Sequence, residues 1–232
     1  MVIACISDTH GIWLPPIPDE ADIVIHAGDV TRGPKTASIM WMELEFAQWA
    51  KTVDRPIYLT WGNHDYIDWP QPFPGGLVLP DNVQICADEA VTIVGTQFWF
   101  SPWSPVFGDW AWMDTESELR KKYTKIPEDT QVIVSHGPPK YYGDCLNDAR
   151  FGPPTHVGST PLLERFMALP EADLLICGHI HSGWGRFTTV DGYVYHGGTN
   201  YTPTKAGKLV VNAAQVDEDY KPVHNAVQLV VV

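Results

Sequence analysis

Short apolar runs recur along the chain, and polar residues follow most of them. The main runs read MVIACIS, ADIVIHAG, RPIYLTWG, AVTIVGTQFWF, TQVIVSHG, ADLLICGH and AVQLVVV. They are rich in Val and Ile and are bounded by Gly, Pro, Asp or Asn, which is typical of strands. Because their hydrophobicity is nearly continuous, with little alternation, we expect β-sheets that are covered on both faces. This pattern constrains the fold more than any other feature.

Three segments between the runs have helical patterns. Residues 36–52 place apolar side chains at three- and four-residue steps, which gives one apolar face. Residues 114–123 begin with Asp114 as the expected N-cap, and the helix predicted within residues 159–169 begins with Thr160 as the expected cap. Strands mixed with helices in this way predict a layered α/β protein.

A hairpin is predicted in the segment GRFTTVDGYVYHGG, where Asp191 and Gly192 separate two β-rich arms. The prolines gather in connecting segments, and none of these is long or uniform enough to be an interdomain linker. We therefore expect a single domain over residues 1–232.

The charge balance argues against one class of partner. The chain has 15 basic and 28 acidic residues, a net charge of −13. Binding along a duplex needs many Lys and Arg to neutralise phosphates, so we expect no long duplex nucleic acid as a partner. A small anionic substrate stays open, because bound divalent cations make an acidic site locally positive. The alternative is that the surplus of acidic residues only keeps the protein soluble.

Several features favour a cytoplasmic protein without a membrane span. No apolar run approaches the roughly 20 residues that cross a bilayer. The N-terminus, MVIACISDTH, lacks a basic region before an apolar segment, so it does not resemble a secretory signal. The four cysteines are far apart in the sequence, which argues against a disulfide framework or a cysteine zinc site. The oligomeric state stays open.

Side chains that bind metals follow five of the predicted strands. The seven candidate ligands are Asp8, His10, Asp29, Asn63, His136, His179 and His181. Ligand sites in α/β sheets form just beyond the carboxyl ends of strands, so we expect these residues in one region. Imidazole, carboxylate and amide groups suit Mn, Fe, Co, Ni or Zn. Seven ligands would serve two ions if one carboxylate bridges them, and two ions about 3.5–4 Å apart can bind a phosphate.

The order of these motifs, DTH, GD, GNHD, an isolated His and GHIH, resembles the calcineurin-like metallophosphoesterase superfamily. Within it, CISDTHG, HAGDVTRG, SPWSPVFGDWAW and SHGPP resemble a small group that contains the brain metallophosphoesterase-domain proteins and bacterial relatives. Some members of that group lack the first His of the last motif. This chain keeps His179 there, so the resemblance implies a complete site.

The resemblance implies two packed β-sheets flanked by helices, a four-layer sandwich with the metal site at one rim. It also implies two divalent ions, manganese first among the candidates. One ion would be held by Asp8, His10 and His181, the other by Asn63, His136 and His179, with Asp29 bridging them. His64 would act as general acid, and Asp65 would fix its orientation. Asp65 could instead cap the turn that follows it.

The function that the resemblance implies is hydrolysis of a phosphate ester, and the narrower group favours a phosphodiesterase acting on small or cyclic nucleotides. Alternatives are a nuclease for short oligonucleotides, a phosphomonoesterase or phosphoprotein phosphatase, and a scaffold that holds metal without turnover.

Other residues are weaker candidates. His26 lies inside an apolar run and is expected in the core, whereas His156, Trp184 and Asn200, with His196 close by in sequence, are candidates for substrate contact. The tryptophans in FWFSPWSPVFGDWAWM are expected mainly in the core, although one or two could line the pocket and stack on a nucleobase.

Overall fold

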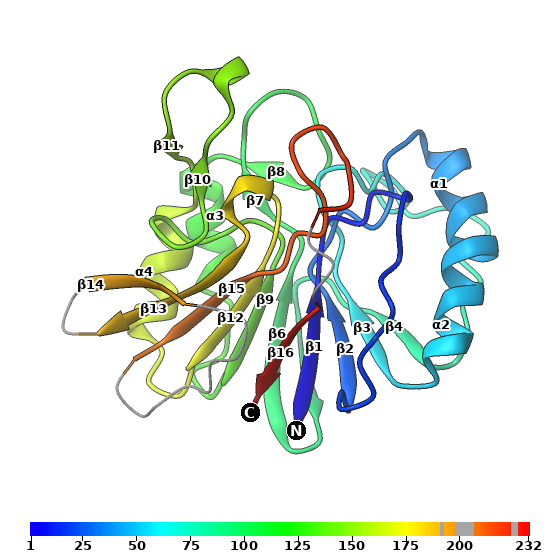
Figure 1. Cartoon of the computed structure of the whole chain (residues 1–232), viewed down its shortest axis with the longest axis horizontal. Coiled ribbons are helices and arrows are strands. Elements are labelled where there is room, and N and C mark those ends of the chain that lie inside the picture. The colour runs from blue at the N-terminus through cyan, green and yellow to red at the C-terminus, as the bar shows by residue number, and fades with distance from the viewer. Residues whose placement is uncertain (191–192, 198–206, 224–226) are drawn as a thin grey trace.

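Two β-sheets lie face to face at the centre of the molecule (Figure 1). The structure is a computed structural model of the chain and describes residues 1–190, 193–197, 207–223 and 227–232. The first sheet has five strands in the order β16-β1-β2-β3-β4, of which β1 to β4 run parallel and β16 is antiparallel to β1. Its strands are β1 (Val2–Ile6), β2 (Ile23–His26), β3 (Ile57–Leu59), β4 (Val83–Ile85) and β16 (Gln228–Val231).

The second sheet has seven strands in the order β14-β13-β15-β12-β9-β6-β5. They are β5 (Glu89–Ile93), β6 (Thr96–Ser101), β9 (Val132–Ser135), β12 (Leu174–Cys177), β13 (Gly185–Val190), β14 (Tyr193–Gly197) and β15 (Leu209–Asn212). Its centre, from β6 to β15, is parallel. The predicted hairpin is confirmed, because β13 and β14 pair antiparallel; its two turn residues lie outside the described part of the chain.

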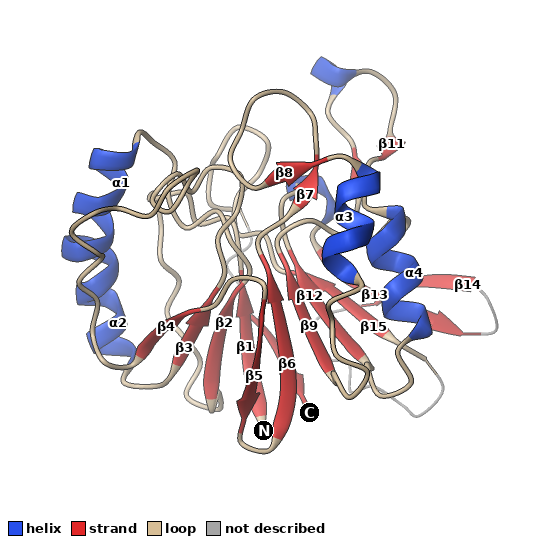
Figure 2. Ribbon diagram, turned by 180° about the vertical axis from the view of Figure 1, so that it is seen from behind, coloured by secondary structure: helices blue, strands red, loops and turns tan. Residues whose placement is uncertain are grey.

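Helices cover the outer face of each sheet (Figure 1, Figure 2). On the first sheet, α1 (Lys35–Trp41), the π-helical η1 (Met42–Phe46) and α2 (Ala47–Val53) follow one another without a break. On the second sheet lie α3 (Glu116–Tyr123) and α4 (Thr160–Ala168).

The side chains of β1 show how the layers are held together. Ile3 and Cys5 belong to the hydrophobic cluster between the two sheets, whereas Ala4 and Ile6 belong to the cluster that includes Phe46 of the helices. A third cluster joins the outer face of the second sheet to α3 and α4. A parallel strand buried on both faces needs the continuous apolar sequence that this chain has. The expected four-layer sandwich of two packed sheets flanked by helices is confirmed.

Two helices begin one residue away from the expected position. Thr115, not Asp114, caps α3, with its hydroxyl accepting a hydrogen bond from the backbone N–H of Glu118 at 3.3 Å. Ser159, not Thr160, caps α4 in the same way. When two adjacent residues can both serve as N-cap, residue type does not predict which one does. The backbone path decides which of them has the extended conformation of an N-cap.

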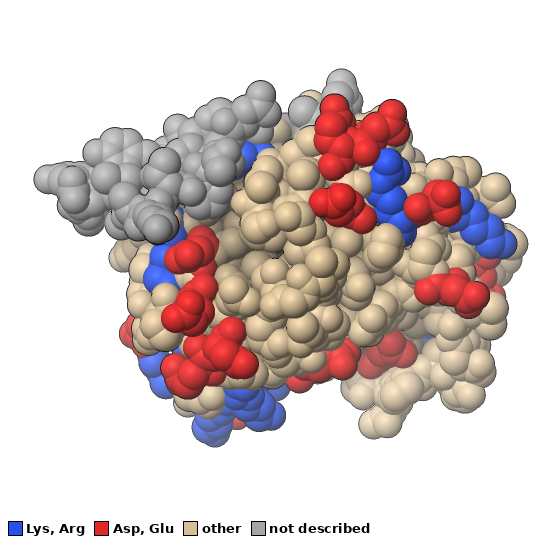
Figure 3. All heavy atoms as spheres, turned by 90° about the horizontal axis from the view of Figure 1, so that it is seen from below, with Lys and Arg blue, Asp and Glu red and all other residues tan. Residues whose placement is uncertain are grey.

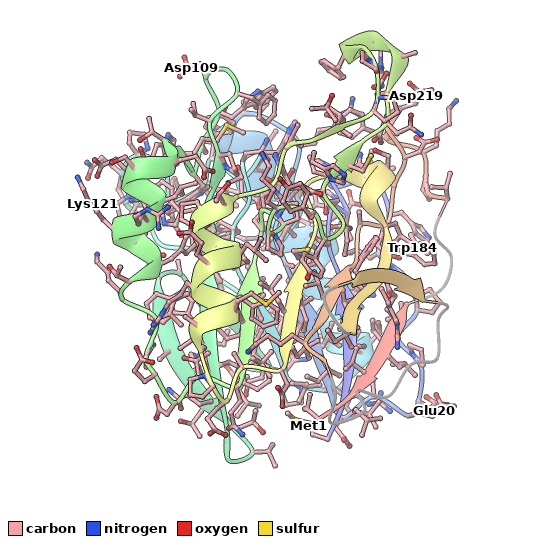
Figure 4. The ribbon with its side chains drawn as sticks, turned by 90° about the vertical axis from the view of Figure 1, so that its left-hand side faces the viewer. Met1, Glu20, Asp109, Lys121, Trp184 and Asp219 are labelled. Atoms are coloured by element: carbon pink, nitrogen blue, oxygen red, sulfur yellow. The ribbon has the colours of Figure 1, made fainter. Side chains whose placement is uncertain are left out.

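Loops and short elements cover the rim where β1, β2, β3, β9 and β12 end. They include the pair β7 (Ser104–Pro105) and β8 (Met113–Asp114), the pair β10 (Cys145–Leu146) and β11 (Thr155–His156), and the 3-10 turns η2 (Ala149–Phe151) and η3 (His181–Gly183). Figure 4 shows Asp109 and Asp219 on loops at this end of the molecule, and Met1 and Glu20 at the other.

The opposite end of the molecule carries its charges at the periphery (Figure 3). Among the described residues visible there, acidic and basic side chains are interspersed around a broad uncharged area and form no continuous basic stripe. Within the described ranges, no helix has both the length and the apolar character needed to cross a bilayer. All four cysteines are free thiols.

The cap assignment leads to a stability prediction. We expect Thr115→Ala to lower the free energy of unfolding by about 1 kcal/mol, because the N–H of Glu118 loses its acceptor. The control Ser117→Ala, exposed in the same helix, should change it by less than about 0.5 kcal/mol. Urea denaturation of the metal-free protein measures both, and equal effects would contradict the assignment.

Candidate metal centre

The predicted ligands converge at the rim. Three groups of side chains have potential ligand atoms within 4.8 Å of one another. The groups are Asp8 with His10 and His181, Asp29 with His136 and His179, and His10 with Asp29 and His64. Because the groups share members, they form one continuous cluster, drawn from strand ends of both sheets.

The potential ligand atoms of the first group face one another. His10 Nε2 lies 3.2 Å from His181 Nε2 and 3.9 Å from Asp8 Oδ1, and His181 Nε2 lies 3.4 Å from Asp8 Oδ1. His181 Nδ1 donates to the backbone carbonyl of Asp217 at 2.8 Å. In a neutral imidazole this bond places the proton on Nδ1 and the lone pair on Nε2, which faces Asp8 and His10. Metal-binding histidines are commonly fixed in this tautomer by such a bond.

The second group has the same design. His136 Nδ1 donates to the Ala27 carbonyl at 2.9 Å, so Nε2 of the neutral ring carries a lone pair. That atom faces Asn63 Oδ1 at 2.9 Å and Asp29 Oδ1 at 3.4 Å. The ring of His179 lies 5.0 Å from that of His136, centre to centre. Two acceptors at 2.9 Å with no proton between them fit a site that holds a cation.

Asp29 lies between the two groups. Its Oδ1 faces His136 at 3.4 Å, and its Oδ2 faces His10 at 3.7 Å. The same Oδ1 accepts a hydrogen bond from the backbone N–H of His64 at 2.8 Å, which fixes the carboxylate. One carboxylate that directs a separate oxygen to each half of the cluster has the orientation required of a bridging ligand.

The cluster is buried and contains the carboxylates of Asp8 and Asp29. Asp8, His10, Asp29, Asn63 and His136 are all at most 2% exposed. Within the described residues, neither carboxylate forms an ion pair with Lys or Arg. Burying two carboxylates without such a partner costs several kcal/mol each, and a bound cation removes that cost. The donor set and its burial thus fit divalent metal ions.

The protonation states of three of the four imidazole ligands agree with this interpretation, whereas the hydrogen bond and charge of Asp8 outweigh burial and raise the pKa of His181. Burial lowers the pKa of His10, His136 and His179, which keeps these imidazoles neutral at pH 7, the form that binds metal. Burial, followed by the carboxylates of Asp8 and Asp65, raises the pKa of Asp29 well above its usual range. A cation beside Asp29 would relieve that repulsion.

The backbone is strained at four of the ligands. Asp8, His10, Asp29 and His179 have φ values of 54°, 49°, 52° and 67°. Residues with a side chain rarely adopt this left-handed conformation, which costs about 1–3 kcal/mol where the surroundings force it. Such strain gathers at functional sites, because the packed sheets hold the strand ends and the side chains must turn sharply into the centre.

Two glycines allow the ligands to approach. A Cβ on Gly178 would lie 2.0 Å from Asp8 Oδ2, and a Cβ on Gly62 would lie 2.4 Å from Asp29 Oδ1 and 2.6 Å from His136 Cε1. These distances exclude any side chain. The glycines of the GNHD and GHIH motifs therefore leave room for the ligands supplied by other strands.

His64 belongs to the third group and lies at the edge of the cluster. Its ring lies 4.8 Å from that of His10 in an edge-on contact and 4.4 Å from the ring of Trp110, tilted by 36°. Burial, followed by the imidazole of His136, lowers the pKa of His64 to about 4. In the free site His64 is therefore neutral at pH 7.

The structure revises the expected role of Asp65. Its carboxylate accepts hydrogen bonds from the N–H groups of Val30, Thr31 and Gly62 and from the Thr31 hydroxyl, at 2.8–3.2 Å. Among the described residues it makes no hydrogen bond to His64. Adjacent side chains in a tight turn point in different directions, so Asp65 joins the turn after β3 to the loop after β2. It thereby holds the segment that carries Asp29.

The weaker candidates are less well placed. His156 Nδ1 lies 2.7 Å from Asp144 Oδ1, with a ring contact to Tyr141, so its described contacts are not with the metal cluster. Trp184 lies on the side of the molecule, below the level of the rim loops (Figure 4). Asn200 lies outside the described residues, and of His196 only the backbone is described. Their contact with substrate stays a prediction.

His26 and two tryptophans of the stretch FWFSPWSPVFGDWAWM have the expected core role. His26 is fully buried and contacts the Thr9 hydroxyl at 3.0 Å. Trp99 and Trp103 are 5% and 7% exposed, whereas Trp110 is 38% exposed beside His64.

Three further residues lie at the site that no sequence motif predicted. The ring of Tyr220, whose φ is 62°, contacts the rings of His10, His64 and His181 at 4.8–6.0 Å. The guanidinium of Arg32 lies 3.9 Å from the centre of the Tyr220 ring. The third is Phe107, which lies against His179. Arg32 follows the GD motif in sequence and could have been found there. Tyr220 has no local signal, because only the fold brings it to the rim.

The glycine contacts lead to a prediction about metal binding. We expect Gly178→Ala to weaken Mn²⁺ binding at least tenfold, because the added methyl group displaces Asp8. The control Gly33→Ala, whose Cβ would meet its nearest neighbour only at 4.0 Å, should keep the affinity of the natural protein. Equilibrium dialysis measures both, with circular dichroism to confirm folding. Unchanged affinity in Gly178→Ala would contradict the proposed ligand geometry.

Comparison with known proteins finds several proteins that are similar to this chain. Metallophosphoesterase domain-containing protein 1 of Homo sapiens and that of Mus musculus are each 27% identical to this chain over an alignment of 246 positions, which covers 95% of this chain and 68% of those proteins. A solved structure, TT1561 of Thermus thermophilus, has a TM-score of 0.49 at 13% identity, and the match covers 84% of this chain and 97% of that one.

The family itself is shown by a sequence model described as calcineurin-like phosphoesterase, which matches residues 1–183. That match contains all five motifs, from Asp8 to His181, and it confirms the resemblance inferred from them. The chain therefore belongs to the calcineurin-like phosphoesterase family, which implies metal-dependent hydrolysis of phosphate esters.

Proposed function

We propose that the protein is a phosphodiesterase that hydrolyses small nucleotide or cyclic nucleotide esters with two divalent ions, manganese first among them. The observation that carries the proposal is the position of Asp29, whose two oxygens face His136 and His10 in separate halves of the cluster. A site for one ion would not need a carboxylate directed to both halves. The acidic chain and its free thiols are consistent with a cytoplasmic enzyme that does not bind long duplexes.

Two sets of residues would bind the two metal ions. Asp8, His10 and His181 would hold one ion, Asn63, His136 and His179 the other, and Asp29 both. When bound, divalent ions supply positive charge to the phosphate oxygens and lower the pKa of water.

Arg32 supports an anionic substrate. Its guanidinium lies over the Tyr220 ring at 3.9 Å, and within the described residues it has no carboxylate partner. An exposed arginine held against an aromatic ring beside the cluster is suited to a phosphate oxygen.

His64 is proposed to donate a proton to the leaving oxygen. To donate a proton, His64 would have to be protonated in the substrate complex, where the negative charge of the phosphate favours the imidazolium form. The rings of His10 and Trp110 lie against His64 and would help to orient it, whereas the Asp65 carboxylate bonds to Thr31 and to backbone N–H groups.

The proposed reaction class has a direct test. We expect the Mn²⁺-loaded protein to hydrolyse bis-p-nitrophenyl phosphate, and to hydrolyse diesters faster than monoesters such as p-nitrophenyl phosphate. The reverse order would favour a phosphomonoesterase, and turnover confined to short single strands would favour a nuclease. No turnover with any of Mn²⁺, Fe²⁺, Co²⁺, Ni²⁺ or Zn²⁺ would favour a scaffold and contradict the proposal.

The role of His64 has a separate test. We expect His64→Ala to keep the metal content but to slow hydrolysis of a cyclic nucleotide by about 10²–10⁴-fold, because the ribose alkoxide is a poor leaving group and needs a proton. Bis-p-nitrophenyl phosphate, with an acidic phenol as leaving group, should lose much less. Equal losses of kcat on the two substrates would count against the role.

A further inference from the structure

The loop between β7 and β8 places large apolar side chains in solvent beside the metal centre. Val106 and Phe107 are 53% and 54% exposed, and Trp110 is 38% exposed. Trp103, just before this loop, is buried in the core by contrast. Figure 4 shows the same loop, marked by Asp109, at the rim end of the molecule. Exposed aromatic residues grouped in one loop are typical of a binding surface.

This loop is tied to the metal-binding turn. The N–H of Ala111 donates to the Asn63 carbonyl at 3.2 Å, and Trp112 Nε1 donates to the Asp65 carbonyl at 2.9 Å. The Tyr66 hydroxyl adds a bond to the carbonyl of Asp109 at 3.3 Å. The loop therefore has a defined position relative to the GNHD motif.

The two exposed rings lie against histidines of the centre. The Phe107 ring is 5.5 Å from the His179 ring, and the Trp110 ring is 4.4 Å from the His64 ring. Between them Gly108 has a φ of 106°, and a Cβ there would lie 3.5 Å from Trp110 Nε1, so the chain turns back toward the indole. One loop thus presents aromatic surface at both the metal-ligand side and the His64 side of the cluster.

We infer that Phe107 and Trp110 form an aromatic platform that binds a planar ring of the substrate while its phosphate occupies the metal centre. The inference rests on the proposed function and adds to it the two side chains, Phe107 and Trp110, that would hold the nucleobase or another flat aromatic group of the ester. The platform lies next to the metal centre. A group that contacts it while the phosphate is bound there would therefore belong to the same molecule as that phosphate. Stacking on aromatic side chains suits any flat ring and does not need a specific hydrogen-bond pattern.

The first experiment measures binding, so it does not depend on turnover. Calorimetry of the Mn²⁺-loaded protein would compare thymidine 5′-monophosphate, phenyl phosphate and inorganic phosphate. We expect both ring-bearing ligands to bind at least about fivefold more tightly than phosphate. Phe107→Leu and Trp110→Leu should each reduce that preference, and Trp110→Phe should keep most of it because a ring remains. Preference for the nucleotide over phenyl phosphate would assign the platform to nucleobases, and equal binding would assign it to flat rings in general.

The second experiment measures selectivity with one leaving group. Thymidine 5′-(p-nitrophenyl phosphate) and methyl p-nitrophenyl phosphate differ only in the group that is retained. We expect the ratio of their kcat/KM values to fall at least about fivefold in Phe107→Leu. The control Phe151→Leu, at a 71% exposed phenylalanine in η2, should keep the ratio of the natural protein.

The outcomes separate the two proposals. Turnover of both esters with an unchanged ratio in Phe107→Leu, together with an unchanged preference of that variant for ring-bearing ligands over inorganic phosphate, would overturn the platform and leave the phosphodiesterase proposal standing. If neither ester is hydrolysed by the natural protein, the phosphodiesterase proposal fails, and the calorimetry decides the platform. Equal binding of inorganic phosphate and the ring-bearing ligands by the natural protein would overturn the platform outright.

Discussion

Two buried carboxylates among four imidazoles are the constraint on which the site depends. Asp8 and Asp29 are almost inaccessible to solvent, and within the described part of the chain neither forms an ion pair with Lys or Arg. Such an arrangement is unfavourable on its own, because water cannot solvate the charges and three of the imidazoles around them are held neutral by burial. Bound divalent cations would supply the missing charge. Folding and metal binding are therefore expected to be coupled in this protein, as they are where ligands are built into a core.

The rest of the structure serves that cluster. Parallel strands from two packed sheets end at one rim, so ligands from distant parts of the sequence meet there. The approach is so close that Gly62 and Gly178 have no room for a side chain, and four ligands adopt the left-handed conformation. The four-layer packing, with a hydrophobic cluster on each face of each sheet, holds this strain in place.

The sequence predicted the fold and the position of the site where a local pattern of residues depends on the arrangement of the whole sheet. Continuous apolar runs predicted strands buried on both faces, and the polar residues after them predicted one rim, because the ends of parallel strands coincide. It was less informative where neighbouring residues compete for one role. Thr115 replaces Asp114 as a cap, and Asp65 bonds to Thr31, since small differences in backbone path decide these contacts.

Contacts of loop residues that belong to no motif could not be predicted. Tyr220 reaches His10 from the far end of the chain, and no pattern around it marks a functional residue. Phe107 and Trp110 belong to a stretch rich in aromatic residues, but only the fold separates the buried rings from the two that lie beside the histidines. Hydrophobic periodicity shows which face of a helix or strand is buried. Because these residues lie in loops, periodicity gives no information about their burial.

The central claim is that Asp29 joins two metal ions, and anomalous scattering from crystals of Mn²⁺-loaded protein tests it most directly. The account predicts two manganese peaks about 3.5–4 Å apart, one on each side of the Asp29 carboxylate. One peak beside His10 and His181, or beside His136 and His179, with the other half vacant at saturating Mn²⁺, would contradict it.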